Sequence, residues 1–150
     1  MAGAFPQQQI YEREPFKAAE NLEPYRFVDP STGRYLDAYA PGVRLGVCQR
    51  RCAAGEMSGA ATRGKIPVES AAINGLNVTD NGASANPRYT RNPAGTDKYL
   101  KIVADGKVDL AGSGETAIAI LDPLSDWAAP AAADKQLVTI ALLPEPYTLP

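Results

Sequence analysis

Turn-forming residues interrupt this sequence so often that few long helices are expected. The 150 residues include 13 glycines and 13 prolines, and proline ends helices because it fixes φ and lacks a backbone N–H. The intervening segments are short, and in them apolar and polar residues alternate, which is the pattern of a half-buried β-strand. The sequence therefore predicts an all-β fold, a small barrel or sandwich of short antiparallel strands.

Two hairpins are expected from their turn residues. In the clearer one, residues 100–104 and 107–110 flank Asp105-Gly106, a dipeptide that tolerates the positive φ values of a type I′ turn. In the other, residues 25–28 and 34–37 flank a longer turn cluster that contains Gly33. Each hairpin is followed by a further alternating segment.

Four more segments have strand character. Residues 43–48, 117–120 and 137–142 are apolar or alternating. Residues 65–69 also alternate, and Pro67 predicts an edge strand there because proline cannot donate to a ladder. The two prolines of residues 144–147 indicate that the last strand ends before them.

The remaining segments define the domain organisation. Residues 1–20 are predicted to be an extended N-terminal arm, because they are polar and have only scattered apolar residues. Residues 21–150 then form a single β domain. Its segments follow the same order in two possible halves, 22–69 and 98–143, joined by a long loop region rich in Asn, Gly and Ala.

Composition excludes several classes of function. The chain has no histidine, which removes the commonest general base and most catalytic zinc sites. The net charge of −2 argues against a nucleic-acid partner. No apolar run is long enough to cross a membrane, and no signal peptide is recognisable, so synthesis in the cytoplasm is expected. We expect no catalytic residue, metal or cofactor, and hence no enzyme.

Cys48 and Cys52 are the only cysteines. Three residues separate them, no histidine or third cysteine completes a zinc site, and no βαβ context supports a redox motif. Two reduced structural thiols are the favoured interpretation for a protein made in a reducing compartment. A short, strained disulfide formed later is the alternative.

Two further features have a functional and a structural interpretation. Asp122, Asp126 and Trp127 resemble a sugar site in composition, but loops commonly carry Asp at turns. Arg50 and Arg51 either pair with acidic residues of a partner or are solvated side chains at a strand end.

The residues at 42–69 resemble a known family. Gly42-Val43-Arg44-Leu45-Gly46-Val47 is followed by Ala53-Ala54-Gly55-Glu56 and then by Lys65-Ile66-Pro67-Val68. This order is similar to that of decoration (cement) proteins from the capsids of tailed bacteriophages. The resemblance implies a mostly β protein without catalytic residues. Such a protein binds the outer capsid surface and stabilises the expanded shell by bridging subunits of the major capsid protein.

The resemblance also implies partners and a location. The partners would be the major capsid protein and two further copies in a homotrimer, and the protein would be made in the host cytoplasm and end on the virion exterior. Aromatic anchors and arginines are the candidate contacts with capsid and neighbouring subunits, although the aromatic side chains could instead fold back on the barrel. The candidate interface residues are Ile10, Tyr11, Arg13, Phe16, Tyr25, Arg50 and Arg51.

The alternative function is ligand binding. A β-sandwich module of a virion or cell surface that binds carbohydrate, or another extended ligand, would use an aromatic platform. Trp127, Tyr35, Tyr39 and Tyr99 are the residues available for it.

Overall fold

The computed structural model describes residues 9–71, 99–121 and 136–150, and over these residues the protein is all-β, as predicted. Apart from the single 3-10 turn η3 (Ala104–Gly106), the named elements are strands. They are β1 (Gln9–Lys17), β2 (Phe27–Asp29), β3 (Arg34–Tyr35), β4 (Gly46–Cys48), β5 (Met57–Ser70), β6 (Tyr99–Val103), β7 (Lys107–Leu110), β8 (Thr116–Leu121) and β9 (Gln136–Thr148).

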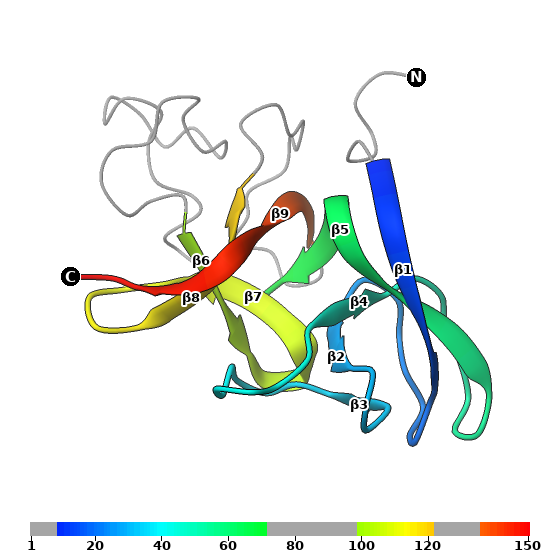
Figure 1. Ribbon diagram of the computed structural model, residues 1–150. Helices are drawn as coiled ribbons and strands as arrows, with labels where there is room; N and C mark the ends of the chain where they lie inside the picture. The colour runs from blue at the N-terminus through cyan, green and yellow to red at the C-terminus, as the bar shows by residue number, and fades with distance from the viewer. Residues whose placement is uncertain (1–8, 72–98, 122–135) are drawn as a thin grey trace.

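Five of these strands close into a barrel (Figure 1). β5 pairs with β7, β7 with β6, β6 with β8, β8 with β9, and β9 returns to β5. All these pairings are antiparallel except the short parallel contact of β5 with β7 at Ser70 and Val108. The ring thus closes through this single bridge between β5 and β7.

The first half of β5 belongs to a second group of strands beside the barrel. There β5 pairs with β1 on one edge and with β4 on the other, and β2 and β3 continue the sheet beyond β4. The main apolar core runs through both groups, since Phe27 and Val47 pack in one cluster with Ile66, Ile118 and Ile140. The two groups therefore form one body around β5.

The segment predicted as an arm is largely part of this sheet. Residues 9–17 form β1, which pairs with β5 from Lys65 to Met57. Phe16 and Ala18 are buried in a second core cluster with Leu22. The expectation of a separate arm therefore does not hold for residues 9–20, because two apolar side chains at i and i+2 are enough to fix one face of a strand. Residues 1–8 lie outside the described part of the chain.

Pro67 lies in a strand that is internal to the sheet, so the prediction of an edge strand is wrong for β5 as a whole and holds only locally at Pro67. β5 is paired on both edges, and Pro67 itself lies opposite Thr139 of β9. Successive N–H groups of a strand point to opposite sides, and the N–H of Glu69, two residues on, donates to the carbonyl of Tyr25 rather than to β9. The nitrogen of Pro67 thus points away from β9, towards an edge where none of the described strands pairs between Lys65 and Ser70.

The other predicted strands are found with shifted ends. β4 is shorter than residues 43–48, and Val43 and Leu45 pack against the main core from the preceding loop. β9 runs on to Thr148 through both prolines, because its pairing with β8 is irregular between Ala117 and Ala119. Most of the long loop region between the two possible halves, and residues 122–135, lie outside the described residues.

The strands of the two halves follow the same order and also pair with corresponding partners. In the first half β2 pairs with β3 and β4, and β4 pairs with β5. In the second half β6 pairs with β7 and β8, and β8 pairs with β9. The hairpin loops differ in length, however, and the second one spans the three residues Ala104–Gly106 between Val103 and Lys107.

Gly106 is predicted to tolerate substitution far less than Gly114, although both have similar positive φ values of 75° and 78°. A Cβ at Gly106 would lie 2.4 Å from the carbonyl oxygen of Phe27, whereas a Cβ at Gly114 would meet nothing within 4 Å. Gly114→Ala should cost about 1 kcal/mol from backbone strain alone, and Gly106→Ala about 3 kcal/mol or more. Urea unfolding of both variants measures the difference in unfolding free energy. Equal losses of stability would show that Phe27 of β2 does not pack closely against this turn.

Candidate functional site

Tyr25 has a strained backbone that the fold holds in place. Its φ is 67°, in the left-handed region that non-glycine residues rarely occupy. Its N–H donates to the carbonyl of Cys48 at 2.7 Å, and its own carbonyl accepts from the N–H of Glu69 at 2.8 Å. Such strain costs about 1–3 kcal/mol and is concentrated at functional sites. This makes the surroundings of Tyr25 the first place to look for function.

A polar pocket of about 280 Å³ lies beside Tyr25. We call it the Tyr25 pocket, and its lining residues come from the segment before β2, from the loop after β4 and from the end of β5. They are Glu23, Pro24, Tyr25, Arg26, Arg51 and Glu69. The pocket therefore brings together three segments that are far apart in the sequence.

One wall of the Tyr25 pocket is a largely buried ion pair. Both Nε and Nη2 of Arg26 lie 2.7 Å from Oε2 of Glu69, and the two side chains are only 13% and 14% exposed. The guanidinium also lies over the ring of Tyr35, 5.6 Å from its centre, and Lys107 lies 4.0 Å from the same carboxylate. These contacts fix the side chains, so this wall is rigid.

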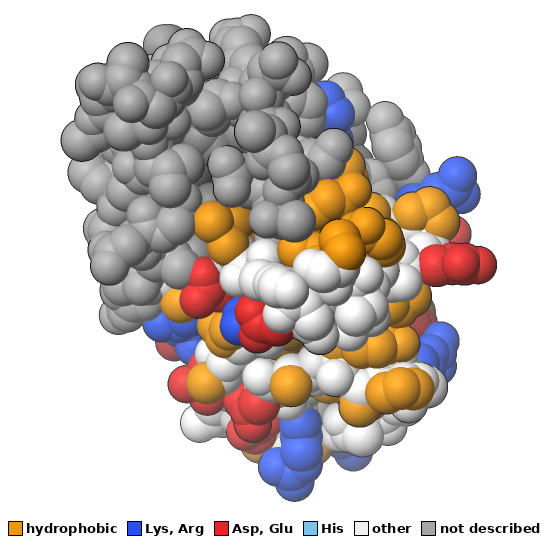
Figure 2. Space-filling model, turned by 90° about the vertical axis from the view of Figure 1, so that its left-hand side faces the viewer, with side chains coloured by type: hydrophobic (Ala, Val, Ile, Leu, Met, Phe, Trp, Pro, Cys, Tyr) orange, Lys and Arg blue, Asp and Glu red, His pale blue; other side chains and the backbone are white. Residues whose placement is uncertain are grey.

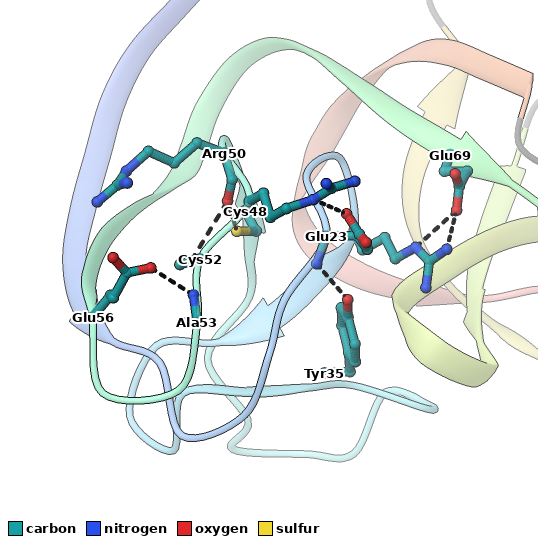
Figure 3. Close-up of polar contacts among 10 residues, drawn as sticks. Glu23, Tyr35, Cys48, Arg50, Cys52, Ala53, Glu56 and Glu69 are labelled. Atoms are coloured by element: carbon teal, nitrogen blue, oxygen red, sulfur yellow. Dashed lines mark hydrogen bonds and ion pairs between the residues drawn. The ribbon is translucent and has the colours of Figure 1, made fainter.

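The opposite wall is an exposed ion pair. Nε of Arg51 donates to Oε2 of Glu23 at 2.8 Å, and the Arg51 side chain is 78% exposed. Such a pair contributes little to stability, about 0–1 kcal/mol, so Arg51 is free to exchange its carboxylate for another. The backbone of Glu23 is better fixed, because its N–H donates to the hydroxyl of Tyr35 (Figure 3). Burial raises the pKa of Tyr35, which keeps this hydroxyl protonated.

The candidate interface residues from the sequence do not all meet at this pocket. Tyr25 and Arg51 line it together. Arg50 points away from it, and its guanidinium donates to the carbonyl of Met57 (Figure 3). Phe16 and Arg13 both belong to β1. The side chain of Phe16 is buried, which excludes it from a surface contact, whereas that of Arg13 is exposed.

The backbones of Ile10 and Tyr11 belong to β1, and their side chains lie outside the described residues. Arg50 and Arg51 are both exposed and both have intramolecular partners, which is compatible with either interpretation drawn from the sequence.

Sequence reasoning missed Arg26, Glu69 and Glu23. Arg26 and Glu69 are 43 residues apart, and nothing in a local pattern joins them. The sequence did place Arg26 directly before an apolar strand of the first hairpin, and hence at the end of that strand. Pairing it with Glu69 required the register between distant strands.

The cysteines lie in the second core cluster, behind the Tyr25 pocket. Both are free thiols, 0% and 2% exposed, which agrees with the reduced structural thiols favoured from the sequence. Each sulfur contacts the carbonyl of Arg50, at 3.0 Å from Cys48 and 3.5 Å from Cys52. Burial raises the pKa of Cys48 to about 11.

The tyrosines proposed as a sugar-binding platform are not brought together. Tyr35 packs against the second core cluster, Tyr39 against the main core, and Tyr99 against a third, small cluster where its ring lies 5.1 Å from that of Tyr147. Asp122, Asp126 and Trp127 lie outside the described residues, so the sugar site stays a prediction.

Within the described ranges, no group of three or more His, Cys, Asp or Glu side chains is placed to hold a metal ion. The same residues contain no helix that is long and apolar enough to span a membrane. Comparison with protein-family models finds no matching family, and comparison with curated proteins finds no matching relative.

Removing the carboxylate from the buried pair should destabilise the protein far more than removing it from the exposed one. Glu69→Gln leaves the Arg26 guanidinium in a largely buried site without its counter-charge, which we expect to cost about 2–4 kcal/mol. Glu23→Gln, an identical chemical change, should cost less than about 1 kcal/mol. The free energy of unfolding in urea tests both, and similar values would mean that the Arg26 pair does not fix this wall of the pocket.

Proposed function

We propose that this chain is a decoration protein of a tailed-bacteriophage capsid. It binds the outer surface of the shell and stabilises the expanded state by bridging subunits of the major capsid protein. The observation that supports the proposal most is the meeting of a strained Tyr25 and an exposed Arg51 at one pocket. Together with the resemblance of residues 42–69 to such proteins, it favours a surface built for protein contact.

The Tyr25 pocket suits a protein partner because its rigid and exchangeable parts are separated. The fixed wall includes Tyr25, whose backbone is held by two hydrogen bonds, so little backbone entropy is lost when a partner packs against it. Tyrosine and arginine are also the residue types that dominate binding energy at interfaces. On the other wall, an acidic side chain of the major capsid protein would replace Glu23 as the partner of Arg51.

The charge pattern of the surface is compatible with this kind of contact. On the face drawn in Figure 2, basic side chains are interspersed with acidic ones rather than gathered in a patch of one sign. A mixed surface selects a partner by complementary pairs and leaves general attraction to polyanions small. This agrees with the net charge of −2.

State selectivity follows from the binding equilibrium. A protein that binds only the expanded lattice stabilises that lattice by RT ln(1 + [L]/Kd) at each site. In a homotrimer three Tyr25 pockets would act together, and weak individual contacts would add through their effective concentration. Since residues 9–17 are part of the sheet, the bridging is assigned to the body of the protein rather than to a free arm.

The proposal predicts that charge reversal at Arg51 weakens capsid binding. Purified wild-type protein should pellet with expanded, stripped heads of the phage that encodes it, at a fixed ratio to the major capsid protein, and not with unexpanded procapsids. Arg51→Glu should raise the apparent Kd by about tenfold or more, because a contact with an acidic partner becomes repulsive.

Arg44 provides the matched control, since it is also an exposed arginine in an ion pair, with Glu14, and it does not line the Tyr25 pocket. Arg44→Glu should bind expanded heads as the wild type does. Equal weakening by both reversals would remove the Tyr25 pocket from the interface, and absence of wild-type binding by folded protein would rule out the decoration function itself.

A further inference from the structure

The two thiols lie next to a pocket that leads to only one of them. This pocket has a volume of about 330 Å³ and is lined by Asn21, Leu22, Glu23, Arg51, Cys52 and Ala53. Cys52 is thus at its wall, whereas Cys48 is 0% exposed and is not among the lining residues. We call this cavity the Cys52 pocket. It shares the lining residues Glu23 and Arg51 with the Tyr25 pocket.

The two thiols share one acceptor. Both sulfurs lie against the same carbonyl oxygen, that of Arg50, and Figure 3 shows Cys48 and Cys52 side by side around it. The side chain of Cys52 also contributes directly to raising the pKa of Cys48. Both sulfurs are thus held in the same short loop around the Arg50 carbonyl.

A buried hydroxyl without a hydrogen-bond partner lies close to Cys48. Among the described residues, Oγ of Ser58 is the one buried side-chain oxygen or nitrogen without a hydrogen-bond partner. Leaving a buried hydroxyl unpaired is costly, and Ser58 is close enough to Cys48 to lower the pKa of its thiol. The hydroxyl is positioned as a donor to an ionised sulfur, which is a species that appears only during reaction.

We propose that Cys48 and Cys52 form a thiol–disulfide exchange site, which small disulfides of the oxidised-glutathione class enter through the Cys52 pocket. This inference does not depend on capsid binding. Arg51, which lines the pocket in an exposed ion pair with Glu23, can exchange that carboxylate for one of such a molecule. Cys52 is the attacking residue and Cys48 the resolving residue.

The reaction has two exchange steps. The thiolate of Cys52 attacks one sulfur of oxidised glutathione, the glutathione S–S bond breaks, and one glutathione thiolate leaves. The thiolate of Cys48, whose formation burial opposes and a hydrogen bond from Ser58 partly favours, then attacks the Cys52 sulfur of the mixed disulfide and releases the second glutathione. Two electrons pass from the cysteines to glutathione, and the two cysteine protons end on the two released thiols.

The test uses the folded, reduced full chain with oxidised glutathione and follows it by intact mass and peptide mapping. The wild type should lose the mass of two hydrogens, with the new bond mapped to Cys48 and Cys52, and dithiothreitol should reverse the change. Cys48→Ser should stop at a stable glutathione adduct on Cys52. Cys52→Ser should remain unmodified, because Cys48 has no access to the pocket.

The Ser58→Ala variant tests whether the Ser58 hydroxyl donates to the Cys48 thiolate during the reaction or is only buried. It should prolong the life of the mixed disulfide about threefold, since the donor to the Cys48 thiolate is gone, while thermal unfolding shows an intact fold. If serine is not tolerated at position 48, Cys48→Ala gives the same comparison.

Three results would overturn the proposal. These are oxidation of the wild type only at denaturant concentrations that unfold it, disulfide-linked dimers in place of the internal bond, or equal glutathione uptake by the two single-cysteine variants.

Discussion

The structure depends on the double pairing of β5. This strand of 14 residues pairs with β1 and β4 over its first half and with β9 and β7 over its second half. Its side chains enter both the second core cluster, through Ala60, and the main core, through Ile66 and Val68. Neither group of strands could bury its apolar face without it. The Tyr25 pocket follows from the same arrangement, because Glu69 near the end of β5 holds both the backbone of Tyr25 and the side chain of Arg26.

Local patterns in the sequence were sufficient for the fold class and for the hairpins. Asp105 and Gly106 both have positive φ, as an Asp-Gly turn requires, and the alternating segments after each hairpin became β4, β5, β8 and β9. These features depend on neighbours in the chain, so they are readable without knowing the tertiary structure. The extent of β5 was not readable in this way. Residues 57–64 are mostly small or polar and form a strand through their partners on both edges.

The same distinction explains what was predicted of the candidate site. Tyr25 and Arg51 were chosen for residue type, and the fold brought them to one pocket. The residues that fix the pocket, Arg26 and Glu69, were missed because their pairing depends on strand register over 43 residues. Phe16 was misassigned for a related reason, since a single aromatic in a polar segment looks like an exposed anchor until the strand it pairs with is known.

The closed ring of strands has a consequence for synthesis of the chain. β9 is the last strand of the described sheet, and it supplies the partner for residues 65–70 of β5 and for β8. Until residues 136–148 leave the ribosome, those two strands expose unpaired N–H and C=O groups beside apolar side chains, a surface that invites pairing with other chains. At ordinary translation rates of about 5–20 residues per second, β5 and β8 therefore lack β9 as a partner for several seconds before the barrel can close.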